Sequence, residues 1–491
     1  MHRIGYVSPT APPHHAPHTL ASTMRWLFSI LLLALLGVVH ALSYTGNRLL
    51  VVLEEAGEKD KYSTFWADLT SRGFSLTFSS PKDDKLSLFK HGERAYDHVI
   101  LLPPKSKGLG PNLSPQTIVE FINREGNILM ALSGESATPT AIQSLLLEFD
   151  IHLSTDRNSL VVDHFNYDKV SAADKHDVLV LDRPQEYKQG VKSFFGGNGV
   201  VAVPRAVGQV LGNENPMLAP ILRAPGTAYP YNPKEEAEAV DDPFAVGTQL
   251  TLVTAFQARN SARFTVLGSS ELLQDKWFDA TVKRGEKEEK TANREFAKQI
   301  TAWTFKEVGV LKVGRLQHWL NEGAVKGGIN ETGLDVPEHN PKIYRIKNDV
   351  AFEIELSEWS NDHFVPFHPA PSDVVQLEFS MLSPFHRLPL TALPPSPTHP
   401  NSTIFATDFK LPDQHGIFNF RVNYKRPFLT NVDEKREVTV RHFAHDEYAR
   451  SWAISGAWPW IAGIWVTVAG WLGFVALWLY SAPSDKSKKT Q

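Results

Sequence analysis

The residues best suited to chemistry lie in one short stretch, residues 163–168, which reads Asp-His-Phe-Asn-Tyr-Asp. A carboxylate beside an imidazole at the end of a predicted strand could act as an acid–base pair. No hydroxyl or thiol nucleophile can be placed beside this pair, so two other interpretations stay open. The stretch is either a hydrogen-bonded loop packed by its two aromatic rings or a loop that recognises a ligand. We keep these residues as a candidate recognition loop without a catalytic role: Asp163, His164, Asn166, Tyr167 and Asp168.

Histidines elsewhere form two groups that could bind a metal, His363 with His368, and His442 with His445 and Asp446. Neither group offers a full set of ligands at a familiar spacing, so we interpret them as loop histidines and predict no metal site. Motifs for a serine nucleophile, a zinc protease or a P-loop do not occur, which predicts no cofactor and no catalytic residue.

The composition limits the class of protein. The chain has 491 residues, of which 42% are hydrophobic, so it can build more than one core. Its formal net charge is −4 and its basic residues are scattered, which argues against a nucleic-acid partner. It contains no cysteine, so disulfides and thiol chemistry are excluded.

The N-terminal residues 1–41 read as a leader and signal peptide. Arg25 precedes an apolar run over residues 26–39, and small residues at the −3 and −1 positions predict cleavage after Ala41. Residues 1–23 lie upstream of this pattern, which suggests that Met24 is the physiological start.

Residues 458–480 have the length of a transmembrane helix, with tryptophan and tyrosine at both edges. A short basic tail, residues 481–491, follows and is predicted to be cytosolic, so the bulk of the chain is lumenal. Within the helix, small residues favour close packing of a partner helix: Gly463, Ala469, Gly470 and Gly473.

Two further sets of residues concern the compartment. Lys488 and Lys489 stand fourth and third from the C-terminus, which favours a dilysine signal for retrieval to the endoplasmic reticulum over simple stop-transfer charge. Asn112, Asn330 and Asn401 begin sequons for possible N-glycosylation, although Pro115 weakens the first.

Three lumenal regions precede the membrane helix. Residues 45–310 alternate apolar strands with helical patterns, which predicts an α/β domain on a parallel sheet, of the flavodoxin or amidotransferase kind. Ser63 and Ser114 are expected to cap helices, and residues 183–247 are expected to be mostly loops. Residues 311–340 are expected to form a linker, and the period of two across residues 341–450 predicts an antiparallel β-sandwich.

Several segments together resemble one family, from about residue 47 through the tail. These segments are 50–54 (LVVLE), 62–66 (YSTFW), 71–74 (SRGF), 96–99 (YDHV), 126–129 (GNIL), 162–168 (VDHFNYD), 267–271 (LGSSE), 376–382 (QLEFSML) and 411–418 (LPDQHGIF). They resemble the forty-eight-kilodalton subunit of the eukaryotic oligosaccharyltransferase, a family that includes wheat-germ-agglutinin-binding protein.

The resemblance implies a non-catalytic subunit of the complex that transfers an oligosaccharide from dolichyl diphosphate to Asn in N-x-Ser/Thr sequons. It further implies catalysis in a separate multi-spanning subunit, and partners that include ribophorin-type and Dad-type subunits. The translocon is a further candidate partner. Two alternatives remain: a lumenal hydrolase or transferase that uses Asp163 and His164, and a glycan-binding cargo receptor.

Overall fold

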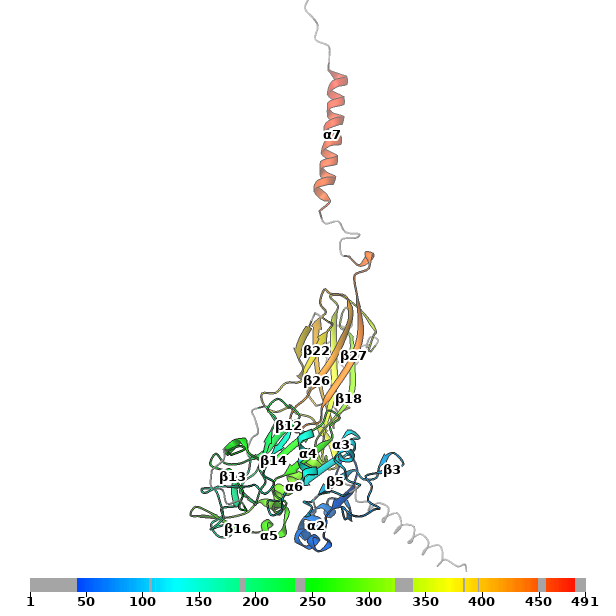
Figure 1. Cartoon of the computed structure of the whole chain (residues 1–491). Coiled ribbons are helices and arrows are strands. Elements are labelled where there is room, and N and C mark those ends of the chain that lie inside the picture. Colours follow the sequence, from blue (N-terminus) through cyan, green and yellow to red (C-terminus); the bar gives the residue numbers. More distant parts are fainter. Residues whose placement is uncertain are drawn as a thin grey trace, which may run out of the picture.

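The computed structural model describes most of the chain, namely residues 42–105, 108–110, 112–184, 190–234, 243–322, 339–382, 385–395, 397–448 and 456–481. These residues form an α/β domain, then a β-sandwich and then one long helix (Figure 1). The predicted signal peptide, the sequon at Asn330 and the tail lysines Lys488 and Lys489 lie outside the described residues.

The α/β domain is organised around a nine-stranded sheet of order β2-β1-β5-β6-β15-β14-β11-β7, with β12 beside β14. Its first five strands run parallel, which confirms the predicted parallel sheet. In chain order these strands stand 2-1-3-4-5, the flavodoxin-like arrangement. They are β1 (Arg48–Val52), β2 (Ser75–Ser79), β5 (His98–Leu101), β6 (Asn127–Ala131) and β15 (Arg263–Leu267).

The sheet continues with four antiparallel strands, which the sequence did not predict as part of it. They are β7 (Ile151–Leu153), β11 (Gln209–Leu211), β12 (Leu218–Arg223) and β14 (Thr251–Gln257). Two small antiparallel sheets join β8 (Leu160–Val162) to β13 (Tyr229–Tyr231), and β9 (Val178–Asp182) to β10 (Val200–Pro204).

The expectation that residues 183–247 are mostly loops missed four short strands. This segment contains β10, β11, β12 and β13, each no longer than six residues. Prolines and glycines interrupt the strands, and their partners lie far away in the sequence, so no local alternation reveals them.

Helices cover both faces of the sheet, as predicted. Along β1, Leu49 and Val51 belong to one buried cluster and Leu50 and Val52 to another, because alternate residues of a strand point to opposite faces. The helices α2 (Ser63–Ser71) and α6 (Asn293–Thr304) contribute to the first cluster, and α3 (Pro115–Asn123) and α4 (Thr140–Glu148) to the second.

One of the two predicted helix caps is confirmed and one is wrong. The Ser114 side chain accepts a hydrogen bond from the Thr117 N–H at the start of α3. At the start of α2, the Asp275 carboxylate from the short helix α5 (Asp275–Phe278) accepts the Ser63 and Thr64 N–H groups instead. A carboxylate on a distant segment has replaced the serine, and its negative charge suits a helix N-terminus.

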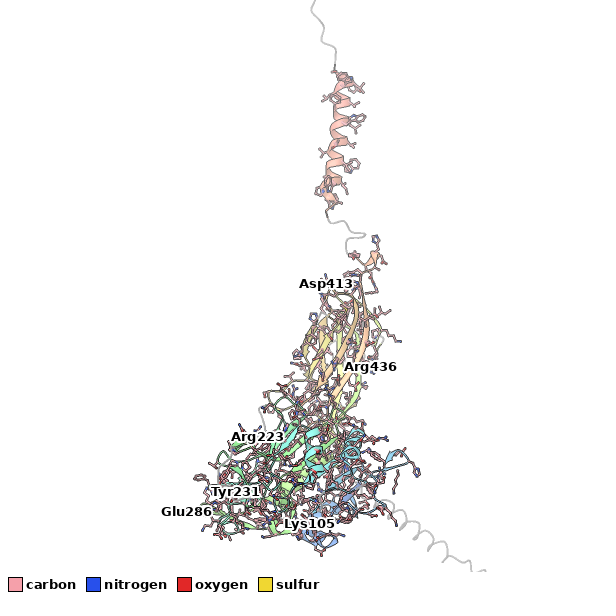
Figure 2. All side chains as sticks on the ribbon, in the orientation of Figure 1. Lys105, Arg223, Tyr231, Glu286, Asp413 and Arg436 are labelled. Atoms are coloured by element: carbon pink, nitrogen blue, oxygen red, sulfur yellow. The ribbon has the colours of Figure 1, made fainter. Side chains whose placement is uncertain are left out.

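Two small hairpins decorate the α/β domain. One joins β3 (Phe89–Lys90) to β4 (Glu93–Arg94), and the other joins β16 (Thr281–Arg284) to β17 (Lys287–Lys290). The turn of the second hairpin projects from the far end of the molecule, where Glu286 is labelled (Figure 2).

The β-sandwich is made of two five-stranded sheets, as predicted from the period of two. Their facing residues form one core that includes Phe352, Leu377, Phe420 and Val438. The first sheet contains β18 (Val308–Leu320), β20 (Asp349–Ser360), β21 (His363–Pro366), β24 (Thr391–Ala392) and β25 (Thr403–Lys410). The second contains β19 (Ile343–Arg345), β22 (Gln376–Ser380), β23 (Phe385–Pro389), β26 (Gly416–Tyr424) and β27 (Val432–Arg441).

The linker predicted over residues 311–340 needs a correction. Residues 311–320 belong to β18, which pairs with nearly the full length of β20. The register of this pair shifts between Val313 and Leu316, so the alternation of inward and outward residues along β18 is interrupted. This interruption hides the strand in the sequence. The sandwich thus begins almost directly after α6.

A shared core and several hydrogen bonds join the two lumenal domains. The buried Arg263 side chain donates to the carbonyls of Trp303 (2.5 Å), Val308 (2.7 Å) and Gly309 (2.7 Å), so it links the end of α6 to the start of β18. Trp303 Nε1 donates to the Phe428 carbonyl at 2.8 Å, and Phe428 packs in the α/β core.

The first described residues form a second connection between the domains, here called the N-terminal clip (residues 42–44). The Trp359 Nε1–H of β20 donates to the Leu42 carbonyl at 2.8 Å, and the Tyr44 ring packs against the Trp359 ring at 5.8 Å. The Ser43 hydroxyl donates to the Phe305 carbonyl at 2.7 Å.

The last element is α7 (Trp458–Tyr480), which is 23 residues long with a mean hydropathy of 1.8 over its most apolar window. None of its residues is buried, and its length and composition suit a membrane span. A short 3-10 turn, η5 (His445–Glu447), lies between β27 and α7.

Candidate functional site

The Asp163 carboxylate lies at the end of β8, where all of its acceptor capacity is used locally. Oδ1 accepts the N–H groups of Phe165 (2.8 Å) and Asn166 (3.2 Å), and Oδ2 accepts the Thr227 hydroxyl at 2.7 Å. Burial alone would raise the pKa of Asp163, but these hydrogen bonds outweigh burial and hold the pKa below its usual value. The group therefore folds the loop as an ionised acceptor.

His164 contacts other partners. Its Nδ1 lies against Nδ1 of His176, and its Nε2 lies 2.8 Å from the Tyr229 hydroxyl. None of the hydrogen bonds found for these described residues joins His164 to Asp163. The adjacent carboxylate and imidazole thus do not form the acid–base pair that the sequence allowed, because neighbouring residues of this loop point to different partners.

The second carboxylate of the loop, Asp168, is also buried and satisfied. Oδ1 accepts the N–H of Lys283 at 2.8 Å, and Oδ2 accepts the N–H of Ser171 at 3.0 Å. Burial opposes its ionisation, yet these bonds keep the pKa of Asp168 low. The Asn166 carbonyl accepts from Val180 N–H, and the Tyr167 ring lies 4.0 Å from the His176 ring.

The exposed part of the loop is an imidazole and aromatic surface. Phe165 is 72% exposed and lies between the two anchored carboxylates. His176, Thr227 and Tyr229 complete the site, and the sequence did not single them out. They come from segments up to 65 positions away, and the pairing of β8 with β13 that brings Tyr229 close could not be predicted.

The crevice between β1 and β5 is where ligands bind in many flavodoxin-like sheets, because strand order reverses there. Here the residues that follow these strands form hydrogen bonds and ion pairs with one another. Glu54 lies 2.8 Å from Lys82 and also accepts the Lys105 N–H at 2.6 Å, while Lys105 Nζ lies 3.0 Å from Glu55. The chain's own groups thus satisfy each other at this position.

The histidines considered as metal ligands lie apart on the sandwich. The exposed His363 contacts the neighbouring Asp362 at 2.5 Å, and the His442 ring lies 3.8 Å from the His415 ring. Among the described residues, no group of three or more His, Asp or Glu side chains is placed to hold a metal ion.

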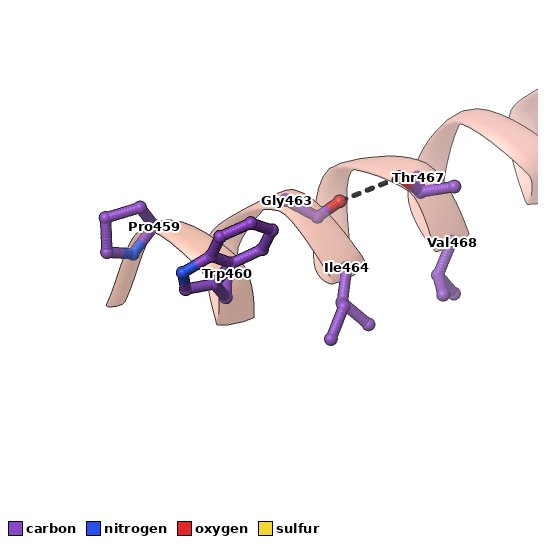
Figure 3. A pocket seen from close by; sticks show the side chains of 6 residues that line it. All are labelled: Pro459, Trp460, Gly463, Ile464, Thr467 and Val468. Carbon is purple, nitrogen blue, oxygen red and sulfur yellow. Dashed lines mark hydrogen bonds between the residues drawn. The ribbon is translucent and has the colours of Figure 1, made fainter. Parts of the chain in front are cut away.

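The small residues of α7 share one side of the helix. At about 100° per residue, Gly463, Gly470 and Gly473 fall within about 80° of one another, and Ala469 lies a further 40° or so around. Next to this side lies a shallow hollow on the helix surface, which is lined by Pro459, Trp460, Gly463, Ile464, Thr467 and Val468 (Figure 3). The Thr467 hydroxyl donates to the Gly463 carbonyl at 2.8 Å, so it needs no partner in an apolar medium.

Two of the predicted sequons lie among the described residues. The side-chain amide of Asn112 donates to the carbonyls of Asp83 (3.4 Å) and Asp84 (3.3 Å). Asn401 is exposed in a turn just before β25. The Asn112 amide is thus hydrogen-bonded within the chain, whereas Asn401 lies exposed at the surface.

Comparison with known proteins covers nearly the whole chain. Residues 40–307 match the model of the OST48 N-terminal domain, and residues 332–482 match that of the OST48 middle domain. The wbp1 subunit of dolichyl-diphosphooligosaccharide–protein glycosyltransferase from Schizosaccharomyces pombe is 34% identical over 86% of this chain and 90% of its own.

The 48 kDa subunits of the same glycosyltransferase from two animals are also similar. The Caenorhabditis elegans protein is 34% identical over 93% of this chain and 96% of its own. The Danio rerio protein is 32% identical over 90% of this chain and 93% of its own. The resemblance seen in the sequence is thereby confirmed, and this chain belongs to the OST48 family.

Proposed function

We propose that this chain is a non-catalytic subunit of an oligosaccharyltransferase, the complex that transfers a preassembled oligosaccharide from dolichyl diphosphate to Asn in N-x-Ser/Thr sequons. The observation that carries the proposal is similarity to named subunits of this glycosyltransferase along 86–93% of the chain. The reaction itself is assigned to a separate multi-spanning subunit. This chain contributes assembly, stability and positioning of substrate.

The geometry of residues 163–168 supports recognition over catalysis. Both carboxylates of the loop are buried and hold backbone N–H groups, so a proton transfer through either would break the loop's own hydrogen bonds. What the loop offers to a partner is the exposed Phe165 ring and the nearby imidazole of His164.

The membrane helix supplies a surface for assembly. A face of small residues lets another helix approach closely, and in lipid such packing replaces the hydrophobic effect as the driving force. Gly463, Ala469, Gly470 and Gly473 are therefore assigned to contacts with neighbouring subunits. These include the catalytic subunit and the ribophorin-type and Dad-type subunits, with the translocon as a further possible neighbour.

The proposed location is the membrane of the endoplasmic reticulum, with one span and the α/β domain and sandwich in the lumen. One apolar helix near the C-terminus supports a single span. The predicted signal peptide and the dilysine pair Lys488 and Lys489 support the orientation and the compartment.

The function is tested by replacing the cell's own copy with a depletable one and measuring sequon occupancy on several unrelated glycoproteins. We expect many sequons to become under-occupied together, and re-expression of this chain to restore them. Normal occupancy after complete depletion would contradict the proposal.

Assembly is tested with a matched pair of helix variants. Gly470→Leu places a leucine side chain on the small-residue face, whereas Val468→Leu places the same side chain more than a third of a turn away. We expect Gly470→Leu to lose co-purifying subunits in mild detergent and Val468→Leu to retain them. Equal recovery of partners with both variants would remove the packing argument.

A further inference from the structure

A row of exposed apolar residues crosses the outer face of the second sandwich sheet. Ile343 of β19 pairs with Thr439 of β27, and Thr439 pairs with Ile417 of β26, so the three side chains lie side by side. Ile343 is 61% exposed and Ile417 is 63% exposed. Their inward neighbours Tyr344 and Phe418 are buried, as the strand period requires.

The hairpin of β22 and β23 extends the row. Ser380 of β22 pairs with Asn419 of β26, and continuing this antiparallel register brings Leu382 opposite Ile417. Leu382 is 105% exposed and Phe385, at the start of β23, is 52% exposed. Met381, just after β22, packs against Gly416 at the start of β26. We call Ile343, Ile417, Leu382 and Phe385 the apolar rim.

The same face becomes charged immediately beyond the rim. Along β27 the outward residues after Thr439 are Glu437, Lys435 and Asp433, moving back through the strand. Lys435 lies 2.8 Å from Glu437, and Asp433 lies 2.8 Å from Arg421. The apolar character is therefore confined to one end of the sheet. A protein partner docked along the whole face would meet charge over most of it.

The rim lies at the end of the sandwich from which the chain leaves for the membrane. β27 ends at Arg441, two residues after the rim's row, and η5 and α7 follow (Figure 1). Asp413 is labelled at this end, whereas Lys105 and Glu286 lie at the opposite end of the molecule (Figure 2).

The connection to the membrane helix is short. Trp458 follows Tyr448 by ten positions, so the two are separated by at most about 35 Å even with a fully extended chain. Arg450 is the one charged residue in this connection, and no further charged residue occurs before Asp485.

We propose that the apolar rim rests in the headgroup region of the bilayer that α7 spans, so that the sandwich stands on the membrane by its tip. The exposed rings and aliphatic side chains bury into the boundary between headgroups and acyl chains, typically about 5–10 Å deep. The Phe443 ring packs against Tyr448 at 5.4 Å and beneath the Arg345 guanidinium at 5.0 Å. This pairing of aromatic ring with cation suits the same interface.

Charges near the rim do not oppose this placement. Asp413 lies 3.1 Å from Lys347, and Glu447 lies 2.7 Å from Arg441, so these two acidic groups at the tip are paired with bases. Paired groups keep part of their stabilisation when water is partly replaced by headgroups.

The absence of cysteine in the sequence makes the test direct. Single variants Leu382→Cys and Ile417→Cys, each carrying an NBD fluorophore, are reconstituted as full-length chain in phosphatidylcholine nanodiscs. A fraction of the lipid carries a doxyl quencher near the top of the acyl chain. The controls are Lys435→Cys, on the same face roughly 14 Å further along β27, and Glu286→Cys at the far end.

We expect several-fold stronger quenching at positions 382 and 417 than at 435, and no quenching at 286. Each labelled variant must unfold at the same temperature as the parent chain, which excludes misfolding as the cause. Equal quenching at 382, 417 and 435 would overturn the proposal. So would rim positions that stay unquenched in nanodiscs and become protected only within the assembled complex, because a protein would then cover the rim.

Discussion

Replacing His98 with asparagine is expected to remove a defined part of the chain's sensitivity to acid. His98 begins β5, is fully buried, and packs between the rings of Phe74 and Phe305. Burial lowers the pKa of this imidazole to about 3. The ring therefore stays neutral in the folded chain at any pH where the chain is ordinarily handled.

The hydrogen bonds around His98 explain why it cannot readily accept a proton. Nε2 lies 3.0 Å from the Gly46 carbonyl, to which it donates, and Nδ1 accepts from the Asn127 amide at 3.2 Å. A proton on Nδ1 would face that amide donor. The amide cannot turn over cheaply, because Asn127 Oδ1 already accepts the buried N–H of Arg263 at 3.0 Å.

The magnitude follows from proton linkage. An unfolded histidine has a pKa near 6.5, so below that pH the unfolded chain binds a proton that the folded chain refuses, and stability falls as pH falls. Between pH 7.5 and pH 5.5 this single group removes about 1.4 kcal/mol from the free energy of unfolding. Since pH 5.5 lies well above the folded pKa, the loss depends mainly on the unfolded value.

The assay is guanidinium unfolding of the full chain in detergent, followed by tryptophan fluorescence at both pH values. The stability difference between pH 7.5 and 5.5 should be smaller in His98→Asn than in the parent by about 1.4 kcal/mol. Phe74→Leu serves as the matched control, because it loosens the same core but keeps His98, and its pH-dependent loss should equal the parent's. An undiminished acid loss in His98→Asn would refute the reasoning.

Three further outcomes test other parts of the structure. Arg263→Met should lower the free energy of unfolding by at least about 3 kcal/mol, because three buried carbonyls lose their donor. Chemical denaturation measures this loss, and a value below about 1 kcal/mol would be inconsistent with the prediction. Trp359→Phe keeps the ring contacts of the N-terminal clip but deletes the hydrogen bond to Leu42. The free energy of unfolding should therefore fall by only about 1 kcal/mol in the same assay. A fall as large as that of Arg263→Met would contradict this prediction. Asn401→Gln should remove a glycosidase-sensitive mobility shift, whereas Asn112→Gln should not, because the Asn112 amide is engaged and Pro115 follows its sequon; a shift lost in Asn112→Gln alone would reverse the assignment.

Much of the fold could be predicted because its signals are local. Continuous apolar runs such as residues 49–53 indicate strands buried on both faces, and β1 lies inside the sheet between β2 and β5. Alternation in β26 predicted that Phe418, Phe420 and Val422 are buried, as they are. The membrane helix was equally clear from length and composition.

What could not be predicted depends on partners distant in sequence. Ser63 is a residue type that often caps helices, but the N-terminal N–H groups of α2 are accepted by the Asp275 carboxylate, which lies more than 200 positions away in the sequence. The candidate loop is likewise completed by Thr227 and Tyr229, which no spacing connects to Asp163. Ile417 did carry a signal: it shares its strand parity with Asn419 and Arg421, so an isoleucine at an outward position was visible in the sequence.

The connection between the two lumenal domains gives the apolar rim a consequence for the whole lumenal body. Arg263 brings a cation to the carbonyl end of α6, where the helix dipole is negative, and thereby fixes the first residues of β18. Gly309 adopts a φ of +69° there, with the Phe428 carbonyl so close that a β-carbon would clash. The N-terminal clip holds β20 from the other side.

Since β18 and β20 pair along nearly their whole lengths, the sandwich continues directly from this connection. A rim seated in the membrane would then set the height and tilt of the α/β domain as well. The loop at residues 163–168 would then be held at a fixed distance above the bilayer. Loosening the connection, as in Arg263→Met, should leave the contrast between positions 382 and 435 in the quenching experiment unchanged as long as the chain stays folded, because both positions lie on the same sheet of the sandwich. A lost contrast would mean that the α/β domain is needed to hold the rim at the membrane.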